Sequence, residues 1–341
     1  MTQGAPSDQG LFDPRLQRRR RARAAARDDA AEFLFVEAAE RLADRLLDVA
    51  RTFPLALEIG CRKGALAARL PEAAGVGRLV GCDLSPEMAA VAQARTGQAR
   101  TGQARTGQAR TGQARTGAAV FAADPAWLPV REESFDLVIS SLALHWVEDL
   151  PGALIQINRA LKPDGLFLAA ALGGDTLAEL RAVMVEAEDR VRGGAAPRVA
   201  PTLALQDAGA LMQRAGFALP VVDFDRLTVT YETFFHLAAE LRAMGETAAM
   251  AQGPRGVPPR ALFTEAARLY AERHAGPDGR IQATFDIVYL HGWAPHESQQ
   301  KPMRPGSARH RLADALQTVE RPAGDLAPAA VPPARTRGGT A

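Results

Sequence analysis

Short apolar runs alternate with helical patterns along this 341-residue chain, and this alternation constrains the fold more than any other feature. The runs typical of strands are Leu55 to Ile59, Arg78 to Asp83, Ala118 to Ala122, Asp136 to Ser140 and Gly165 to Ala171. Helical patterns lie around them, over Phe33 to Ala50, Gly64 to Leu70, Pro86 to Ala94 and Pro151 to Leu161. Because strands separated by helices form βαβ units, the pattern predicts a parallel sheet with helices packed on it.

The second half of the chain completes this sheet. We expect helices over Thr176 to Arg192 and Leu203 to Ala215, a strand over Phe224 to Tyr231, a helical insertion over 232–280 and a last strand over Ile281 to Trp293. The predicted fold class is therefore α/β, with a Rossmann-like seven-stranded sheet, helices on both faces and a helical insertion before the last strand.

The composition is that of an ordinary globular protein, with 47% apolar and 23% charged residues. No window approaches the roughly 20 consecutive apolar residues that a membrane-spanning helix needs. The net charge of +2 is too small to indicate a nucleic-acid partner, and Cys61 and Cys82 lie in no spacing typical of a metal site. We therefore predict a cytoplasmic protein without a metal site or a transmembrane segment, with peripheral attachment at the inner membrane face left open.

Two segments stand outside the alternating pattern. Residues 93–117 read QARTG five times, too short and too polar a period for a solenoid, and we interpret them as a surface insertion without an assigned function. The tract from Arg15 to Arg23 could contact an acidic partner, a membrane surface or RNA, or simply form a solvated helix face. We expect residues 1–30 to be a mobile basic segment, 31–296 to form the folded domain and 297–341 to be a disordered tail.

The first strand ends in a glycine-containing turn that is typical of nucleotide-binding sheets. Glu58 lies at the end of the strand, and Gly60 and Gly64 allow the backbone to approach a ligand closely. Asp83 ends the next strand at about the 20-residue separation expected of an acid that accepts both hydroxyls of a ribose. The spacing predicts one shared cofactor pocket, although Asp83 could instead cap the helix that begins at Pro86.

Further candidates follow the third and fourth strands. Asp124, with Trp127-Leu128-Pro129 as an apolar wall beside it, suits an adenine ring, but Asp-Pro also starts ordinary turns. His145 and Trp146 come after the fourth strand, at the edge where open α/β sheets bind ligands. His145 is a candidate catalytic base and Trp146 a candidate stacking surface for a substrate, and both could equally be packing residues.

Together these motifs resemble class I methyltransferases that use S-adenosyl-L-methionine (SAM), over residues 55–171. The resemblance implies a class I methyltransferase fold with SAM as cofactor. It also implies cofactor-binding roles for Glu58, Gly60 and Gly64, which would face the methionine part. Asp83 would then bind the ribose and Asp124 the adenine.

Segments nearer the ends of the chain are similar to the complex I assembly factor 5 family and its bacterial relatives. These segments are Phe12-Asp13 with the basic tract, Leu241 to Glu246, Gly292 to Gln299 and Gly306 to Ala308. The resemblance implies hydroxylation of an arginine in the quinone-proximal iron–sulfur subunit of complex I, which would then be a partner. The sequence has no His-x-Asp or His-x-Glu pattern typical of an iron site, so hydroxylation follows from the resemblance alone.

The central region is also similar to the malonyl-ACP O-methyltransferase of biotin synthesis, over Leu142 to Trp146 and Gly174 to Arg181. That similarity implies acyl carrier protein as the alternative partner, with Arg181 holding an acyl carboxylate and His145 deprotonating the acceptor. Arg181 could instead be an exposed helix charge.

A third hypothesis is an assembly chaperone for complex I without catalysis. Its motivation is Arg62, which stands where most methyltransferases of this class carry a glycine. The Arg62 side chain must either point away from the cofactor or narrow the pocket, and the sequence does not decide whether SAM binding is weakened.

Overall fold

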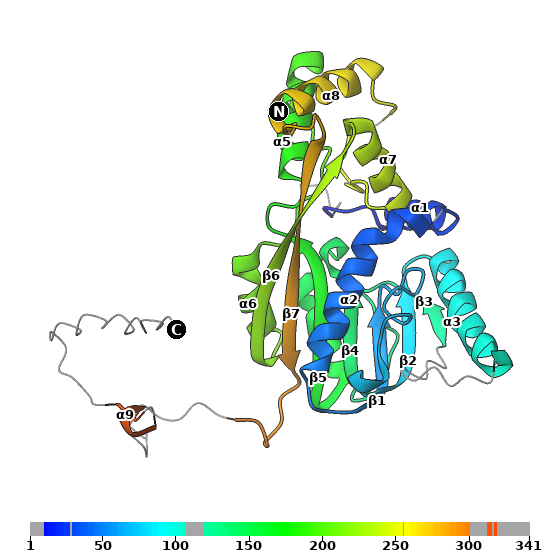
Figure 1. The fold of residues 1–341 in the computed structure, drawn as a ribbon, viewed down its shortest axis with the longest axis vertical. Helices are drawn as coiled ribbons and strands as arrows, with labels where there is room; N and C mark the ends of the chain where they lie inside the picture. The colour runs from blue at the N-terminus through cyan, green and yellow to red at the C-terminus, as the bar shows by residue number, and fades with distance from the viewer. Residues whose placement is uncertain are drawn as a thin grey trace, which may run out of the picture. The chain divides into compact units, whose positions relative to one another are not determined.

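Seven strands form one sheet in the order β3-β2-β1-β4-β5-β7-β6 in the computed structural model (Figure 1). The strands are β1 (Phe53–Ile59), β2 (Val76–Asp83), β3 (Val120–Ala122), β4 (Phe135–Ser141), β5 (Leu161–Gly173), β6 (Ala218–Tyr231) and β7 (Ile281–Trp293). The structure describes residues 10–27, 29–106, 119–254, 256–300, 312–315 and 317–318. Strands β1 to β5 pair in parallel, whereas β7 is antiparallel to both of its neighbours, β5 and β6.

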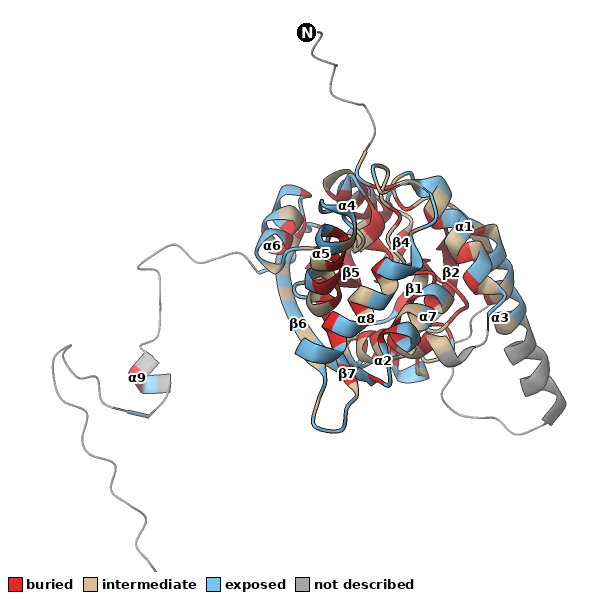
Figure 2. Ribbon diagram, turned by 90° about the horizontal axis from the view of Figure 1, so that it is seen from above, coloured by how far each residue is buried: buried red, intermediate tan, exposed pale blue. Residues whose placement is uncertain are grey.

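Helices cover both faces of this sheet, which confirms the predicted fold class. The α-helices are α1 (Pro14–Ala25), α2 (Phe33–Leu47), α3 (Pro86–Thr106), α4 (Leu150–Ala160), α5 (Ala178–Arg192), α6 (Leu205–Arg214), α7 (Phe234–Met244), α8 (Arg260–His274) and α9 (Leu312–Ala315). Short 3-10 turns are η1 (Asp29–Glu32), η2 (Glu72–Ala74) and η3 (Leu144–Trp146). One core joins α2, α5, α7 and α8 to the sheet, and a second joins α4 and α6 to its other face. Figure 2 shows the buried residues concentrated in the strands between these layers.

The predicted strands all form, but the sheet buries them to different extents, since β3 has no fully buried residue and Tyr231 is the one buried residue of β6. Strand β1 has the burial expected of an interior strand, with Ala56 in one core and Leu57 and Ile59 in the other. The predicted helix over Gly64 to Leu70 is wrong, since these residues form a series of turns. Helix α3 runs beyond the predicted end at Ala94 into the QARTG repeat, and residues 107–118 lie outside the described part.

The N-terminal segment differs from the prediction of a mobile tract over residues 1–30. Residues 14–25 form α1, whose first turn is capped by the Asp13 side chain, and Arg21 is 1% exposed. The difference arises because Asp83, at the end of β2, gives Arg21 a partner in the interior of the protein. Residues 1–9 lie outside the described part.

The chain divides into two units, 1–297 and 298–341. In the second unit only a few residues are described, including α9, so most of the predicted disordered tail lies outside the described residues. None of the described helices is long and apolar enough to cross a membrane.

Candidate functional site

The glycine turn is held at the carboxyl edge of β1, β2 and β4. The amides of Gly60 and Cys61 both donate to the carbonyl of Cys82, with N···O distances of 2.8 and 2.9 Å. Gly60 has a φ of 77°, and a Cβ at this position would lie 2.3 Å from the Cβ of Ala143. Glycine is therefore required here both by the backbone conformation and by the close approach of the loop after β4.

Glu58 and Gly64 flank this turn. Gly64 has a φ of 84° and lies against Ala92 of α3. Glu58 is 2% exposed, and burial, together with the nearby charge of Asp83, raises the pKa of Glu58 to about 8. At neutral pH this carboxyl group is therefore mostly protonated, so it can donate one hydrogen bond as well as accept others.

Asp83 is enclosed at the end of β2, with a side chain that is 0% exposed. Its Oδ1 accepts the amide of Ser85 at 2.9 Å, and its Oδ2 accepts the amide of Arg62 at 3.1 Å and Nη1 of Arg21 at 3.3 Å. The Ser85 hydroxyl accepts the amide of Met88 in the first turn of α3 at 3.3 Å. The side-chain cap of α3 is therefore Ser85, which leaves the carboxylate of Asp83 facing Arg62 and Arg21.

Arg62 adopts a left-handed conformation with a φ of 47° and turns its side chain into the protein. Its guanidinium lies 3.5 Å from the ring centroid of Phe35 and donates to Oε1 of Glu246 at 2.7 Å and to the carbonyl of Met244. Burial lowers the pKa of Arg62, although the charge of Glu246 opposes this. The side chain that replaces the usual glycine is thus fixed by an aromatic ring and a buried carboxylate.

Glu246 connects the turn after β1 with the segment after β4, and the sequence analysis assigned it no role. Besides Arg62, it accepts Nε1 of Trp146 at 2.6 Å and lies 3.3 Å from Nε2 of His145. Burial alone would raise its pKa, but hydrogen bonding to His145 and the charge of Arg62 prevail and hold the pKa of Glu246 at about 2. The available signal was an acid directly after Gly245, in a segment noted only for its family resemblance.

His145 is nearly enclosed, and both of its ring nitrogens have partners. The amide of Leu172 donates to Nδ1 at 3.3 Å, which assigns the proton to Nε2, where it faces Glu246. In this tautomer the one ring lone pair, on Nδ1, accepts the amide of Leu172 and is not free to accept a proton from a substrate. The residue that was predicted as a catalytic base is placed to orient Glu246.

Trp146 and Arg181 were predicted to contact the substrate, and the structure places these two residues in different surroundings. Trp146 packs edge-on against Phe12, with ring centroids 5.2 Å apart, and lies at the wall of a cavity. Arg181 donates to the carbonyls of Thr176 and Ala200, both at 3.3 Å, and does not line that cavity.

Asp124 lies beside a smaller cavity of about 340 Å³, which the other predicted cofactor residues do not line. The cavity is lined by Pro14, Arg15, Arg18, Leu84, Pro86, Ala122, Ala123 and Asp124. Oδ1 of Asp124 accepts the amide of Ala126 at 2.9 Å, as in an ordinary turn. Trp127, predicted as a wall for adenine, is 79% exposed and does not line this cavity. Residues Arg15 and Arg18 of α1 lie at the cavity instead.

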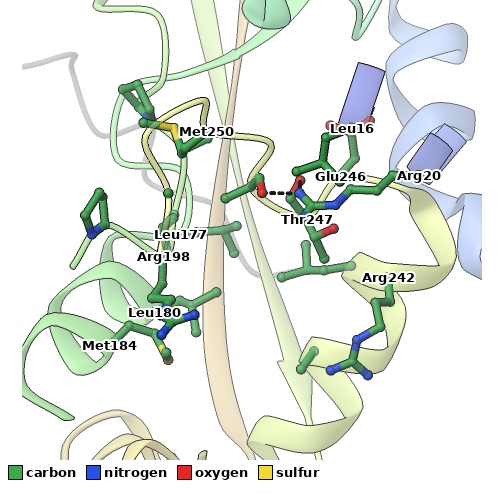
Figure 3. A pocket seen from close by; sticks show the side chains of 18 of the residues that line it. Leu16, Arg20, Leu177, Leu180, Met184, Arg198, Arg242, Glu246, Thr247 and Met250 are labelled. Atoms are coloured by element: carbon green, nitrogen blue, oxygen red, sulfur yellow. Dashed lines mark hydrogen bonds between the residues drawn. The ribbon is translucent and has the colours of Figure 1, made fainter. Parts of the chain in front are cut away.

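A larger cavity of about 600 Å³ lies on the other side of α1, where His145, Trp146 and Glu246 reach its wall. Figure 3 shows Leu180 and Met184 of α5 on one side and Arg20 and Arg242 on the other. Arg20 donates to the carbonyls of Thr247 and Ala248, and Arg242 has no hydrogen bond or ion pair with any side chain that the structure describes. An apolar body with a polar or charged end would match this lining.

Cys61 lies in the glycine turn and Cys82 in β2, and both are buried free thiols. Burial raises the pKa of Cys61 well above its usual value and that of Cys82 to about 12, so neither is a thiolate at neutral pH. Across the described ranges, no three acids, histidines or cysteines gather in a way that could hold a metal ion.

The side chains at this edge are those that a nucleoside cofactor requires, namely two carboxyl groups beside a glycine turn. Two buried donors are also unsatisfied there, since Nε of Arg21 and Nε of Arg62 have no hydrogen-bond partner within the described part of the chain. A bound acceptor would satisfy such donors. The carboxyl groups, the glycine turn and the unsatisfied donors are therefore of the chemical types that bind a ribose-bearing cofactor. Binding also requires that Asp83 becomes accessible.

Comparisons with known proteins identify the family of the chain. Residues 57–169 match the family model of a methyltransferase domain. The chain is 38% identical over 312 residues to the mitochondrial arginine-hydroxylase NDUFAF5 of Danio rerio, covering 90% of this chain and 91% of that protein. The human NDUFAF5 is 38% identical over 306 residues, covering 89% and 83%.

Two further relatives bear on the fold and the chemistry. The malonyl-ACP O-methyltransferase of Halorhodospira halophila is 33% identical over 307 residues, covering 89% of this chain and 96% of that protein. The YcgJ protein of Bacillus subtilis superposes with a TM-score of 0.52 at 15% identity, over 75% of this chain and 99% of that one, which is a likeness of fold.

Proposed function

Because this chain belongs to the family of the NDUFAF5 arginine hydroxylases and to the SAM-dependent methyltransferase superfamily, we propose that it hydroxylates a protein arginine during assembly of respiratory complex I. The target that we propose is the quinone-proximal iron–sulfur subunit. The observation that carries the proposal is the 38% identity along 91% of the Danio rerio protein, which extends far beyond the methyltransferase domain at 57–169.

We propose SAM as the cofactor, bound at the carboxyl edge of β1 and β2. Asp83 would accept the ribose hydroxyls and Asp124 would contact the adenine, while Glu58 and the turn from Gly60 to Gly64 would face the methionine part. SAM supplies a sulfonium-activated methyl group, which methyl transfer consumes and hydroxylation does not. Hydroxylation with dioxygen places one oxygen atom on the arginine and releases the other as water, so it also requires two electrons and two protons from a reductant.

The acceptor would enter the larger cavity, which ends on His145, Trp146 and Glu246. Glu246 is ionised and buried, so it fixes the indole of Trp146 and the imidazole of His145 in one orientation. His145 can act as a base only after it loses the hydrogen bond from the amide of Leu172. Within the proposed reaction it is a positioning residue rather than a proton acceptor.

A gene deletion in the host tests the proposal. Peptide mass spectrometry of the quinone-proximal subunit should show one arginine that loses the mass of one oxygen atom in the deletion strain and regains it when the wild-type gene is restored. An arginine that is unmodified in the parent strain would refute hydroxylation.

Complementation with a variant separates an enzyme from a chaperone. Asp83→Asn keeps the shape of the side chain but removes its charge, and an enzyme that depends on the cofactor should then fail to restore the modification. The exposed Asp44→Asn is the matched control and should complement fully. If Asp83→Asn restores complex I assembly without the modification, the protein acts as a non-catalytic assembly chaperone.

One observation favours a second candidate, O-methylation of malonyl-ACP. Arg20 contacts only backbone carbonyls and Arg242 has no partner within the described part of the chain, so both leave positive charge at the cavity wall. Positive charge suits a carboxylate acceptor better than a guanidinium. Methyl transfer from SAM to malonyl-ACP by the purified protein, lost in Arg242→Gln, would establish this reaction, and no transfer by the wild type would exclude it.

A further inference from the structure

The basic tract of α1 has a role that a solvated helix face would not have. Of its arginines, Arg19 and Arg23 are exposed, whereas Arg21 is 1% exposed and points into the protein. Arg21 reaches Asp83, which lies at the end of β2 and 62 residues later in the chain. An element outside the nucleotide-binding βαβ unit thus contacts the acid that the proposed cofactor needs.

The pair between Arg21 and Asp83 is poorly satisfied for two buried charges. Its shortest recorded contact joins Nη1 to Oδ2 at 3.3 Å, and Nε of Arg21 is buried without a hydrogen-bond partner among the described residues. Desolvation of both charges offsets much of their attraction when the geometry is not ideal. Such a pair can be exchanged for a better-matched partner.

The other two contacts of Asp83 come from the turn after β1 and from the segment between β2 and α3. The backbone amides of Arg62 and Ser85 donate to its two oxygens. A ribose brings two hydroxyl donors and needs free lone pairs on both oxygens. With Asp83 fully enclosed, Arg21 is the contact that can leave without rebuilding the sheet.

We infer that Arg21 competes with the ribose of the cofactor for Asp83, so that α1 has to release this carboxylate before a nucleoside binds. The inference rests on the proposed binding of SAM. Helix α1 is also tied to the loop after α7, since Arg20 donates to the Thr247 and Ala248 carbonyls and the amide of Asp13 donates to Ala249 at 2.8 Å. Because Arg20 also lines the larger cavity, release of α1 opens the cofactor edge and the acceptor cavity together.

Calorimetric titration of the purified full chain with adenosine and with S-adenosylhomocysteine tests the competition. Adenosine carries the ribose and the adenine but no carboxylate, so it reports on the contact with Asp83 without any contribution from the methionine part. A minor open state of 10% or less makes the apparent affinity about 10-fold weaker than the intrinsic one, so Arg21→Gln should bind adenosine about 10-fold more tightly. The exposed Arg19→Gln removes the same charge from the same helix and should bind like the wild type.

Urea unfolding shows whether Arg21→Gln is folded. A second variant tests the inference independently of that result. Arg20→Gln loosens α1 from the loop without touching Asp83 and should also tighten adenosine binding. Unchanged or weaker adenosine binding by both variants would overturn the inference. The inference would also be overturned if Arg21→Gln bound S-adenosylhomocysteine more weakly than the wild type while its binding of adenosine did not change. Arg21 would then be a ligand of the cofactor carboxylate.

The outcome also distinguishes this inference from the proposed cofactor. If the wild type binds the nucleosides and neither variant changes the affinity, only the competition is refuted. If neither nucleoside binds to the wild type, to Arg21→Gln or to Arg20→Gln, the assignment of SAM fails and the competition fails with it.

Discussion

Replacing Glu58 with glutamine should stabilise the protein increasingly as the pH rises. The carboxyl group has a pKa of about 8 in the folded protein, because it is buried beside Asp83, against 4.5 for the ordinary side chain. The folded state therefore binds the proton more tightly than the unfolded state, so the contribution of Glu58 to stability is full below pH 4.5 and is lost as the pH rises toward 8. At about 1.4 kcal/mol per pKa unit, the cost of Glu58 grows from about 1 kcal/mol at pH 5 to about 4 kcal/mol at pH 8.

Urea unfolding of the wild type and of Glu58→Gln between pH 5 and pH 8 measures this cost directly. Glutamine has the same shape and stays neutral, so the free energy of unfolding of the variant should gain about 3 kcal/mol on the wild type over this range. The exposed Glu132→Gln should show no such trend. A difference between wild type and Glu58→Gln that stays constant with pH would refute the protonation of Glu58, and with it the description of the turn.

The buried network and the glycine turn give three more predictions. Glu246→Gln should lower the free energy of unfolding at pH 7 by about 3 to 5 kcal/mol, because Arg62 loses its buried counter-charge. The deficit should shrink as the pH falls from 4.5 toward 2, since the pKa of Glu246 is held at about 2 and its contribution is lost on protonation, and a pH-independent deficit would contradict this. Arg181→Ala should leave the proposed modification unchanged and cost only about 1 kcal/mol in urea unfolding, and loss of modification in a folded variant would restore it as a substrate ligand. Gly60→Ala should lower the free energy of unfolding by about 2 kcal/mol or more, because of its positive φ and the contact with Ala143, and a free energy of unfolding like that of the wild type would show that the loop after β4 can move away.

The sheet could be predicted from sequence because its signals are local. The predicted strands are mainly apolar runs, except for Phe224 to Tyr231, which alternates apolar and polar residues, and the observed strands overlap all of them. Strands β5 and β6 extend further than predicted, because β5 begins at Leu161 beside Phe135 of β4 and β6 pairs with β7 from Ala218 onward. The failed helix after Gly64 shows the reverse case, in which a helical pattern of seven residues is too short to resist the geometry of the turn.

The candidate site was predicted less well because its partners are distant in sequence. Asp83 and Glu58 lie at the predicted edge of the sheet, but nothing near Arg21 shows that one arginine of a polar tract would be buried against Asp83. Likewise, Glu246 is 101 residues from His145 and 184 from Arg62, and only the folded chain brings them together. Whether these side chains bind SAM and a substrate is still a proposal.

The position of β7 between β5 and β6 has a consequence for the order in which the protein can be made. Translation delivers β7 last of the seven strands, yet β6 pairs with no other strand of the sheet. Until residues 281–293 leave the ribosome, β6 has nowhere to pair and β5 presents an open edge, so the nascent chain exposes two strands that can pair with other chains. A message truncated before codon 281 would therefore yield an aggregation-prone product in spite of its complete set of proposed cofactor residues.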